Sequence, residues 1–124
     1  MRRRVVVTGI GTVSSAGLDA LEFTAALKDG KQCFAEIDDP RIDKLTATHA
    51  GRVFGLEPGI DDPQQVRSMD RNVHLALKAL REALHEAGLQ GKPLGRRAAV
   101  VFGTCSGGMF SIERHYEGLN RGED

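Results

Sequence analysis

The 124-residue sequence contains no tryptophan, a single tyrosine and five phenylalanines. Proteins that bind single-stranded nucleic acid stack bases on aromatic side chains, so this composition argues against such a surface. A basic excess is missing as well, because 17 Lys and Arg balance 17 Asp and Glu and give a formal net charge of zero. Binding driven by phosphate charge needs a clear basic excess. We therefore expect no nucleic-acid partner.

Long apolar runs are also absent. No stretch approaches the roughly 20 residues of a membrane-spanning helix, so we expect no membrane partner. The basic residues 2–4 are followed by only three valines before Thr8, which is shorter than the apolar region of a signal peptide. Cysteine occurs twice, as the widely separated Cys33 and Cys105, without a Cys-x-x-Cys motif. This usage predicts reduced thiols in the cytoplasm, and neither a disulfide framework nor a metal site.

Glycine, by contrast, is frequent, with 15 residues, and two glycine-containing turns follow apolar runs. Residues 5–7 and 98–102 are apolar at consecutive positions, which is typical of strands buried on both faces of a parallel sheet. The pattern predicts an α/β protein in which tight turns connect strands to helices.

Two shorter helices are predicted beside these strands. Asp19 has the side chain of an N-cap, and Glu22 three residues later completes a capping box. Gly30 is a natural stop for this first helix. The other short helix is predicted from residue 109 to about residue 119, behind the second glycine-rich turn.

The longest helix is predicted over residues 71–87. Apolar residues recur there at helical spacing between Asp70, a capping residue, and Gly88, a stop signal. The opposite, polar face carries Arg71, Lys78, Arg81, Glu82 and Glu86. Between the first helix and this one, residues 31–68 are predicted to be irregular, because several prolines and glycines interrupt them. A short strand is expected within this segment at residues 51–54.

The predicted strands lack neighbours. Two isolated strands are only marginally stable in water, and parallel strands are normally covered on both faces. We therefore expect the 124 residues to be the opening of a larger protein or one part of an assembly. By itself the chain is expected to be poorly soluble or oligomeric.

Gly9 and Gly11 form a Gly-x-Gly sequence after the first apolar run. In a dinucleotide-binding loop, such glycines let backbone N–H groups hold a pyrophosphate. Ser14 stands in place of the third glycine of that fingerprint, and no acidic residue ends a second strand about 20 residues later. A tight turn is therefore favoured, and a small nucleotide-binding domain is the weakest of three functional hypotheses.

Residues 103–108 form a second glycine-rich stretch, at the carboxyl end of the second apolar run. Ligands of open α/β sheets bind at that edge, whereas the same glycines also suit a packing turn, and both interpretations stay open. Cys105 has the chemistry of a nucleophile. His115 lies about three helical turns further on, which is too far to activate it. A small buried thiol is the favoured interpretation of Cys105.

Four segments, in order along the chain, resemble β-ketoacyl-[acyl carrier protein] synthases, the elongating condensing enzymes of fatty-acid and polyketide synthesis. They are residues 3–14, Met69-Asp70-Arg71, residues 86–89, and Gly103-Thr104 with Gly107-Gly108. The resemblance implies a thiolase-like fold, in which two βαβαβαββ halves pack as an αβαβα layered sandwich, usually in a homodimer. Residues 1–124 match only the N-terminal portion of such an enzyme, an incomplete first half.

The activity that this resemblance implies is an acyltransferase reaction, the decarboxylative Claisen condensation of an acyl thioester with malonyl-acyl carrier protein. The implied partners are acyl carrier protein, whose phosphopantetheine carries the acyl groups, and a second copy or a related ketosynthase subunit. No separate cofactor is implied. In the family, the cysteine nucleophile and two histidines lie downstream of the matched segment. No position here matches their motifs, so no catalytic residue is assigned, Cys105 included, and the isolated 124 residues are expected to be inactive.

The resemblance assigns one candidate substrate site, an acyl-pocket loop made of Cys105, Ser106, Gly107 and Gly108. In the elongating enzymes, an apolar residue that gates the pocket commonly stands where Ser106 stands here. Ser106 is smaller and polar, so we expect a pocket for a short or polar, polyketide-like acyl chain. The sequence leaves open whether the pathway makes fatty acids or polyketides. The alternative function is a non-catalytic, ketosynthase-like partner subunit or remnant.

Overall fold

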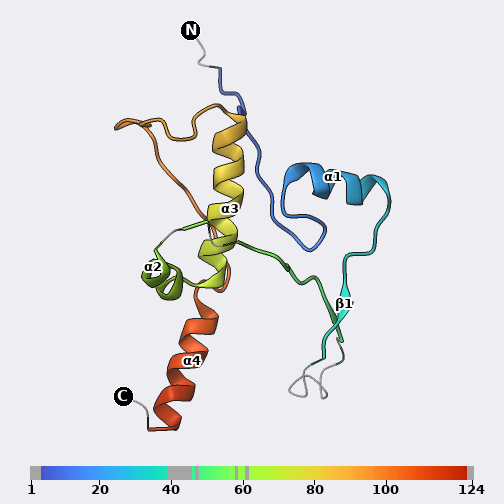
Figure 1. Ribbon diagram of the computed structural model, residues 1–124, viewed down its shortest axis with the longest axis vertical. Helices are drawn as coiled ribbons and strands as arrows, with labels where there is room; N and C mark the ends of the chain where they lie inside the picture. Colours follow the sequence, from blue (N-terminus) through green and yellow to red (C-terminus); the bar gives the residue numbers. More distant parts are fainter. Residues whose placement is uncertain (1–3, 39–45, 47, 58, 61, 123–124) are drawn as a thin grey trace.

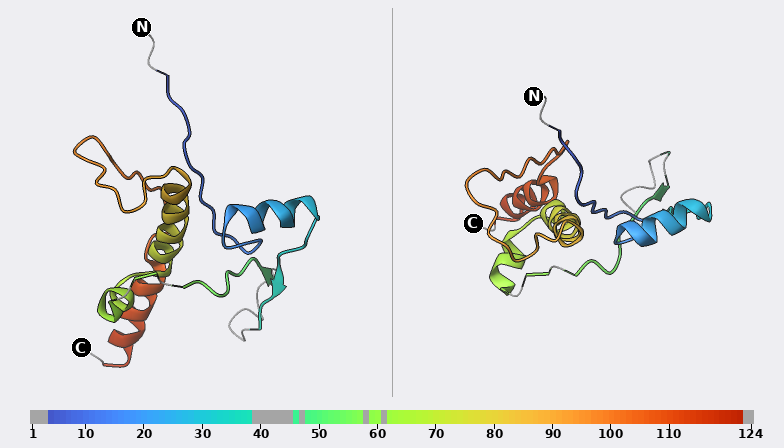
Figure 2. Two further views of the ribbon diagram at one scale, coloured as in Figure 1. Left: turned by 45° about the horizontal axis from the view of Figure 1, so that its top comes forward. Right: turned by 90° about the horizontal axis from the view of Figure 1, so that it is seen from above.

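The computed structural model describes residues 4–38, 46, 48–57, 59–60 and 62–122. Its helices and strands are α1 (Ala20–Lys28), β1 (Ala35–Glu36), β2 (His49–Ala50), α2 (Pro63–Ser68), α3 (Arg71–Glu86) and α4 (Met109–Asn120). In Figure 1, α3 and α4 follow one another along the long axis, while α1 and the strands lie to one side. The two views in Figure 2 agree that α1 and the strand pair stand apart from α3 and α4.

The three predicted helices are confirmed. The Asp19 carboxylate accepts the N–H of Glu22 at 2.8 Å, and the Glu22 carboxylate accepts the N–H of Leu18 at 2.8 Å. This reciprocal pair is the capping box that begins α1. Gly30 follows α1 with φ 61°, a conformation that glycine adopts without a steric penalty. Both α3 and α4 end within one residue of the predicted ends.

The segment of residues 31–68, predicted to be irregular, contains β1, β2 and α2. β1 and β2 pair antiparallel, so the strand expected at residues 51–54 is wrong and the pairing lies at His49–Ala50. The Asp62 carboxylate caps α2 by accepting the N–H of Gln64 at 2.8 Å, and Pro63 opens the helix where its missing N–H carries no penalty. Proline here starts a helix instead of interrupting one.

The two apolar runs are not strands. Residues 5–7 and 98–102 are extended, but neither forms a ladder with any other part of the chain that the structure describes. Val5 is 95% exposed and Val101 is 93% exposed. A strand exists only where a neighbouring strand takes up its N–H and C=O groups, and these runs have no such neighbour among the described residues. The predicted strands are thus corrected to extended segments.

Residues 9–12 run directly against α3. A Cβ atom on Gly9 would lie 2.0 Å from the carbonyl oxygen of Ala83, and one on Gly11 would lie 1.8 Å from that of Ala79. Glycine at both positions therefore allows the two backbones to approach closely. This contact favours the packing interpretation of the Gly-x-Gly sequence over a loop that binds a pyrophosphate.

The carboxylates of α3 hold this segment in place. Glu82 accepts the N–H of Thr12 at 2.9 Å and that of Ala20 at 2.7 Å, and Glu86 accepts the N–H of Ile10. The sequence placed both glutamates on the polar face of the helix. They bind backbone there, so that face anchors the N-terminal segment and the first turn of α1.

A buried core is nearly missing from the described residues. Ala26 of α1, 7% exposed, is the one buried hydrophobic side chain among them. Most side chains of α3 are half-buried beneath the extended segments, and those of α4 are exposed. Many large apolar side chains of the described residues are therefore exposed, those of Val5 and Val101 most of all.

Candidate functional site

The glycine-rich stretch of residues 103–108 folds into a turn that leads into α4. The hydroxyl of Thr104 accepts the N–H of Gly107 at 3.1 Å, and Gly107 has φ 50°. A side chain is rarely tolerated in that conformation, so glycine is needed at this position. Gly108 is the N-cap residue of α4 and offers no side chain to cap the helix. The turn thus presents residues 105–108 at the start of the helix.

This turn meets the beginning of α3. The hydroxyl of Ser111 donates to the Asp70 carboxylate, and Gly108 lies against the same carboxylate. A hollow of about 240 Å³, here called the loop hollow, opens beside the contact. Its lining includes Asn72, Leu75, Ser106, Gly107, Met109 and Phe110. Apolar groups from two helices therefore face a short polar loop across one small cavity.

The four residues of the predicted acyl-pocket loop do not all line the same cavity. Ser106 and Gly107 line the loop hollow, and Gly108 touches Asp70 at its edge. Cys105 does not line the hollow and is exposed, so its expected burial as a small thiol is wrong for the residues described. His115 lies within α4 beside Tyr116, with ring centroids 5.9 Å apart.

Sequence reasoning missed the α3 side of the loop hollow. Asn72 and Leu75 lie one and four residues into the long helix and carried no motif of their own. The side-chain oxygen of Asn72 is buried and has no hydrogen-bond partner in the part of the chain that the structure describes. Buried polar atoms are normally satisfied, and Asn72 borders both this hollow and a larger cavity along α3.

A second, larger cavity of about 490 Å³ lies along α3, and we call it the α3 hollow. Its walls include Gly11 of the N-terminal segment, the α3 residues Asn72, Leu77 and Leu80, and the extended residues Val101 and Phe102. These walls are almost entirely apolar. The hollow thus lies between the segment that follows the first apolar run and the second apolar run itself.

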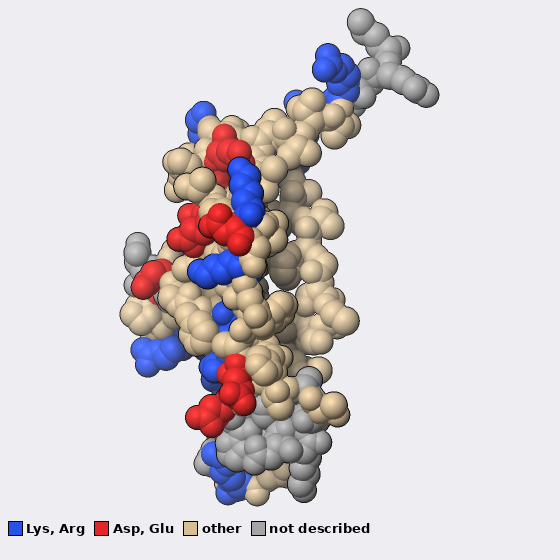
Figure 3. Space-filling model, turned by 90° about the vertical axis from the view of Figure 1, so that its right-hand side faces the viewer, with Lys and Arg blue, Asp and Glu red and all other residues tan. Residues whose placement is uncertain are grey.

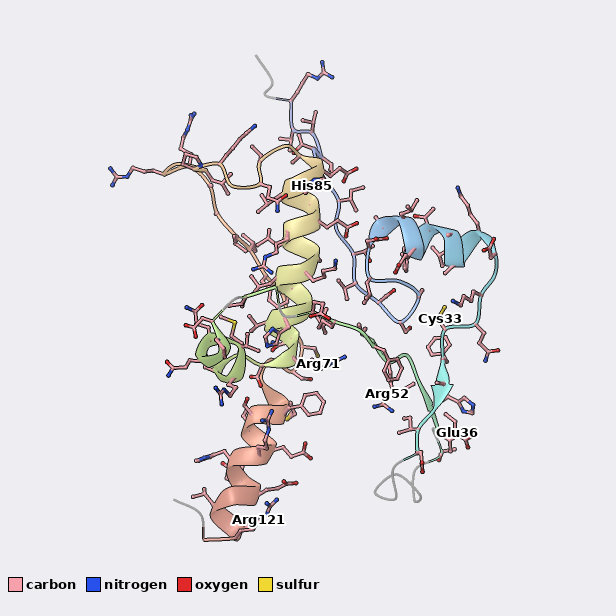
Figure 4. The ribbon with its side chains drawn as sticks, viewed as in Figure 1. Cys33, Glu36, Arg52, Arg71, His85 and Arg121 are labelled. Atoms are coloured by element: carbon pink, nitrogen blue, oxygen red, sulfur yellow. The ribbon has the colours of Figure 1, made fainter. Side chains whose placement is uncertain are left out.

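Side chains of α3 contact two segments that precede the helix, the stretch around Val53 and α2. The guanidinium of Arg71, labelled in Figure 4 near the end of α3 that adjoins α4, donates to the carbonyl oxygen of Val53. The guanidinium of Arg52, next to Val53 in the chain, lies over the ring of Phe54, 5.1 Å from the ring centroid. The imidazole Nε2 of His74 lies 3.3 Å from the carbonyl oxygen of Val66 in α2. His74 therefore contacts α2.

On the face drawn in Figure 3, Lys and Arg alternate with Asp and Glu mainly along the left side, and the right side is largely uncharged. Among the described residues, no group of three or more His, Cys, Asp and Glu side chains is arranged to hold a metal ion. The helices described here are also too short or too polar to cross a membrane. Cys33 and Cys105 are both free thiols.

Comparison with known proteins gives a consistent result. The chain is 36% identical over 129 residues to a putative polyketide beta-ketoacyl synthase 1 of Streptomyces halstedii, covering 98% of this chain and 29% of that protein. It is 32% identical over 120 residues to nodulation protein E of Rhizobium sp. (strain N33), covering 96% of this chain and 30% of that protein.

A third relative is 3-oxoacyl-[acyl-carrier-protein] synthase 2 of Coxiella burnetii, 31% identical over 120 residues, covering 95% of this chain and 29% of that protein. The chain thus spans about three tenths of the length of these relatives. Residues 2–123 match the family described as "Beta-ketoacyl synthase, N-terminal domain". The chain therefore belongs to the β-ketoacyl synthase family, whose N-terminal domain its residues represent.

Proposed function

We propose that these residues are the N-terminal part of a complete β-ketoacyl synthase, an acyltransferase that condenses an acyl thioester with malonyl-acyl carrier protein. The observation that carries the proposal is the family match over residues 2–123. Relatives named as polyketide and 3-oxoacyl-[acyl-carrier-protein] synthases support it. Within the complete enzyme, the described residues contribute the loop hollow as one wall of the acyl-binding pocket.

The proposed reaction proceeds in two stages. An enzyme thiolate attacks the carbonyl carbon of the acyl thioester, and the carrier thiolate leaves, so the acyl group is bound to the enzyme. Malonyl-carrier protein then loses carbon dioxide, and the carbanion that remains attacks the acyl-enzyme carbonyl. A carbon–carbon bond forms, the enzyme thiolate leaves, and the product is a β-ketoacyl thioester on the carrier protein.

None of these bond changes is assigned to a residue of this chain. By resemblance to the family, the thiolate and the two histidines that assist decarboxylation come from other parts of the complete protein. Cys105 lies outside the lining of the loop hollow, which argues against it as the thiolate. The role proposed for residues 105–108 is to shape the space that receives the acyl chain.

The loop hollow supports a preference for short or polar acyl chains. Ser106, whose side chain ends in a hydroxyl, lines it. A chain bearing oxygen or hydroxyl substituents can hydrogen-bond to this hydroxyl, whereas a saturated chain cannot. The small volume, about 240 Å³, also limits how much of a long chain the described walls accommodate.

Further parts of the proposal follow from family membership. The complete protein adopts the thiolase-like αβαβα sandwich and works as a homodimer or with a related ketosynthase subunit. Acyl carrier protein is its partner and delivers every acyl group on phosphopantetheine, so no other cofactor takes part. Two free cysteines support a reducing, cytoplasmic location.

The test is a condensation assay with the gene product at its full natural length. The purified protein is mixed with acyl- and malonyl-carrier protein, and carbon dioxide release and β-ketoacyl product are measured. Stoichiometric formation of both is expected. If the protein forms neither, the proposed activity is wrong. If it forms neither but binds a second ketosynthase and raises the activity of that enzyme, the non-catalytic partner subunit replaces it.

A further inference from the structure

We propose that Asp70 is a positioning residue, which fixes the first turn of α4 and through it the Ser106–Gly107 wall of the loop hollow. The consequence for acyl preference rests on the proposed function, whereas the positioning itself does not. Asp70 has no contact with a reacting atom. Its effect on the acyl chain passes through Gly108 and Ser111.

The carboxylate of Asp70 is directed to the neighbouring helix. Asp70 is the N-cap residue of α3, yet its side chain makes no capping hydrogen bond to that helix. It accepts a hydrogen bond from the hydroxyl of Ser111 in the first turn of α4 instead. The N-cap residue of α4 is Gly108, which has no side chain for the task. Asp70 thus places a negative charge near the N-terminus of α4, where it is favoured by the helix dipole.

Gly108 makes this approach possible. A Cβ atom at position 108 would lie 2.1 Å from Oδ2 of Asp70, well inside van der Waals contact. Any larger residue must displace the carboxylate or the start of α4. A Cβ atom on Gly103, in the same turn, would have no neighbouring atom within 4 Å. Glycine at position 108 therefore allows the Asp70 carboxylate to lie this close to the start of α4.

The contact bears directly on the loop hollow. Ser106 and Gly107 precede the Asp70 contact along the chain, and Met109 and Phe110 follow Gly108; all four line the hollow. Asp70 itself is half-buried at the same edge. When its carboxylate is lost, the first turn of α4 is free to shift against α3. The spacing of both walls then changes, and with it the fit of the acyl chain.

The experiment compares Asp70→Asn, Asp70→Ala and Gly108→Ala with a matched control, Asp62→Ala, in the complete protein. Asp62 also caps a helix, α2, but does not line the loop hollow. The first readout is hydrogen–deuterium exchange in peptides covering residues 106–112. We expect Asp70→Ala and Gly108→Ala to speed exchange there about tenfold, because a charge-assisted contact is lost. Asp70→Asn keeps an acceptor and should show a smaller effect, and Asp62→Ala should show none.

The second readout is the ratio of kcat/KM for a short acyl-carrier protein to that for a longer one. We expect Asp70→Ala to reduce this ratio several-fold, with Asp70→Asn in between and Asp62→Ala unchanged. If Asp70→Asn and Asp70→Ala both exchange like Asp62→Ala over residues 106–112, the positioning role is overturned. Faster exchange with an unchanged ratio overturns its effect on acyl preference. A wild-type protein that condenses nothing refutes the proposed function, while the exchange data still decide the positioning.

Discussion

The carboxylate of Glu82 on α3 accepts the backbone N–H of Thr12 at 2.9 Å, across 70 residues of sequence. Its other oxygen accepts the N–H of Ala20, the first residue of α1, at 2.7 Å. The first N–H groups of a helix have no partner within that helix. A single side chain thus satisfies one such group and holds the N-terminal segment to α3.

Replacement of Glu82 by alanine is expected to destabilise the complete protein by about 2–3 kcal/mol, because two backbone donors lose a charged acceptor. Urea unfolding followed by circular dichroism gives this number. The control is Glu117→Ala on α4, where an exposed carboxylate pairs with Arg121 at 3.0 Å. Such an exposed pair is screened by solvent and contributes about 0.5 kcal/mol or less. Equal losses for the two variants would contradict an anchoring role for Glu82.

Alanine at Gly11 is expected to prevent residues 9–12 from packing on α3. Its Cβ would lie 1.8 Å from the carbonyl oxygen of Ala79, and backbone cannot move aside as a flexible side chain can. Overpacking of this kind costs about 1–3 kcal/mol or more. Thermal unfolding of the complete protein measures the loss, with Gly103→Ala as a sterically open reference.

A nicotinamide or flavin nucleotide is not expected to raise the Tm of the wild-type protein in the same assay, because the glycines pack against α3. A nucleotide-dependent increase that Gly11→Ala abolishes would revive the dinucleotide-binding interpretation.

The helices could be predicted from sequence because their signals are local. Asp19 and Glu22 cap α1 across three residues, and Gly30 ends it, so no distant part of the chain is needed to recognise the helix. The apolar runs, residues 5–7 and 98–102, are not the strands that the sequence predicts, for the opposite reason. A strand is defined by its neighbour, and within the described residues Val5 and Val101 have none.

The candidate site could likewise be predicted from the sequence only in part. Ser106 and Gly107 are assigned to an acyl-pocket loop only through the family resemblance; they line a small cavity, and their contact with an acyl chain stays a prediction. The other wall could not be assigned, because Asn72 and Leu75 carry no local motif. The contact of Asp70 with Ser111 spans 41 residues, and only the packing of α3 against the start of α4 brings the two together. Sequence spacing and periodicity do not predict a contact of this kind.

Ser106 is expected to favour polar acyl chains over saturated chains of equal length. Replacement by alanine removes the hydroxyl without adding bulk, so the preference should fall up to about tenfold, the net effect of losing one neutral hydrogen bond. The measurement is kcat/KM for matched acyl-carrier proteins of graded length and polarity. A wild-type protein that prefers long saturated chains would show that the loop hollow is not shaped as proposed.

The acyl-enzyme is expected to form on a residue other than Cys105. The complete protein is incubated with acyl-carrier protein without the malonyl partner, quenched in acid and digested with trypsin. Cleavage after Arg97 and Arg114 places Cys105 in the peptide of residues 98–114. Mass spectrometry should find this peptide without an acyl group. The exposed thiol should also be alkylated faster than that of the half-buried Cys33. An acylated 98–114 peptide would make Cys105 the nucleophile after all.

A lysine at position 101 is expected to act in opposite directions on the isolated chain and on the complete protein. In the described structure Val101 is 93% exposed, so Val101→Lys removes apolar surface from water at no burial penalty and should reduce self-association of residues 1–124. Light scattering after size-exclusion chromatography measures this.

In the complete protein, residues 98–102 are expected to become a strand covered on both faces. An unpaired ammonium there should lower the yield of folded protein sharply, since burying a charge without a partner is strongly unfavourable. A complete protein that tolerates Val101→Lys with an unchanged Tm would mean that residues 98–102 stay exposed, and the predicted buried strand would then be wrong in the whole enzyme as well.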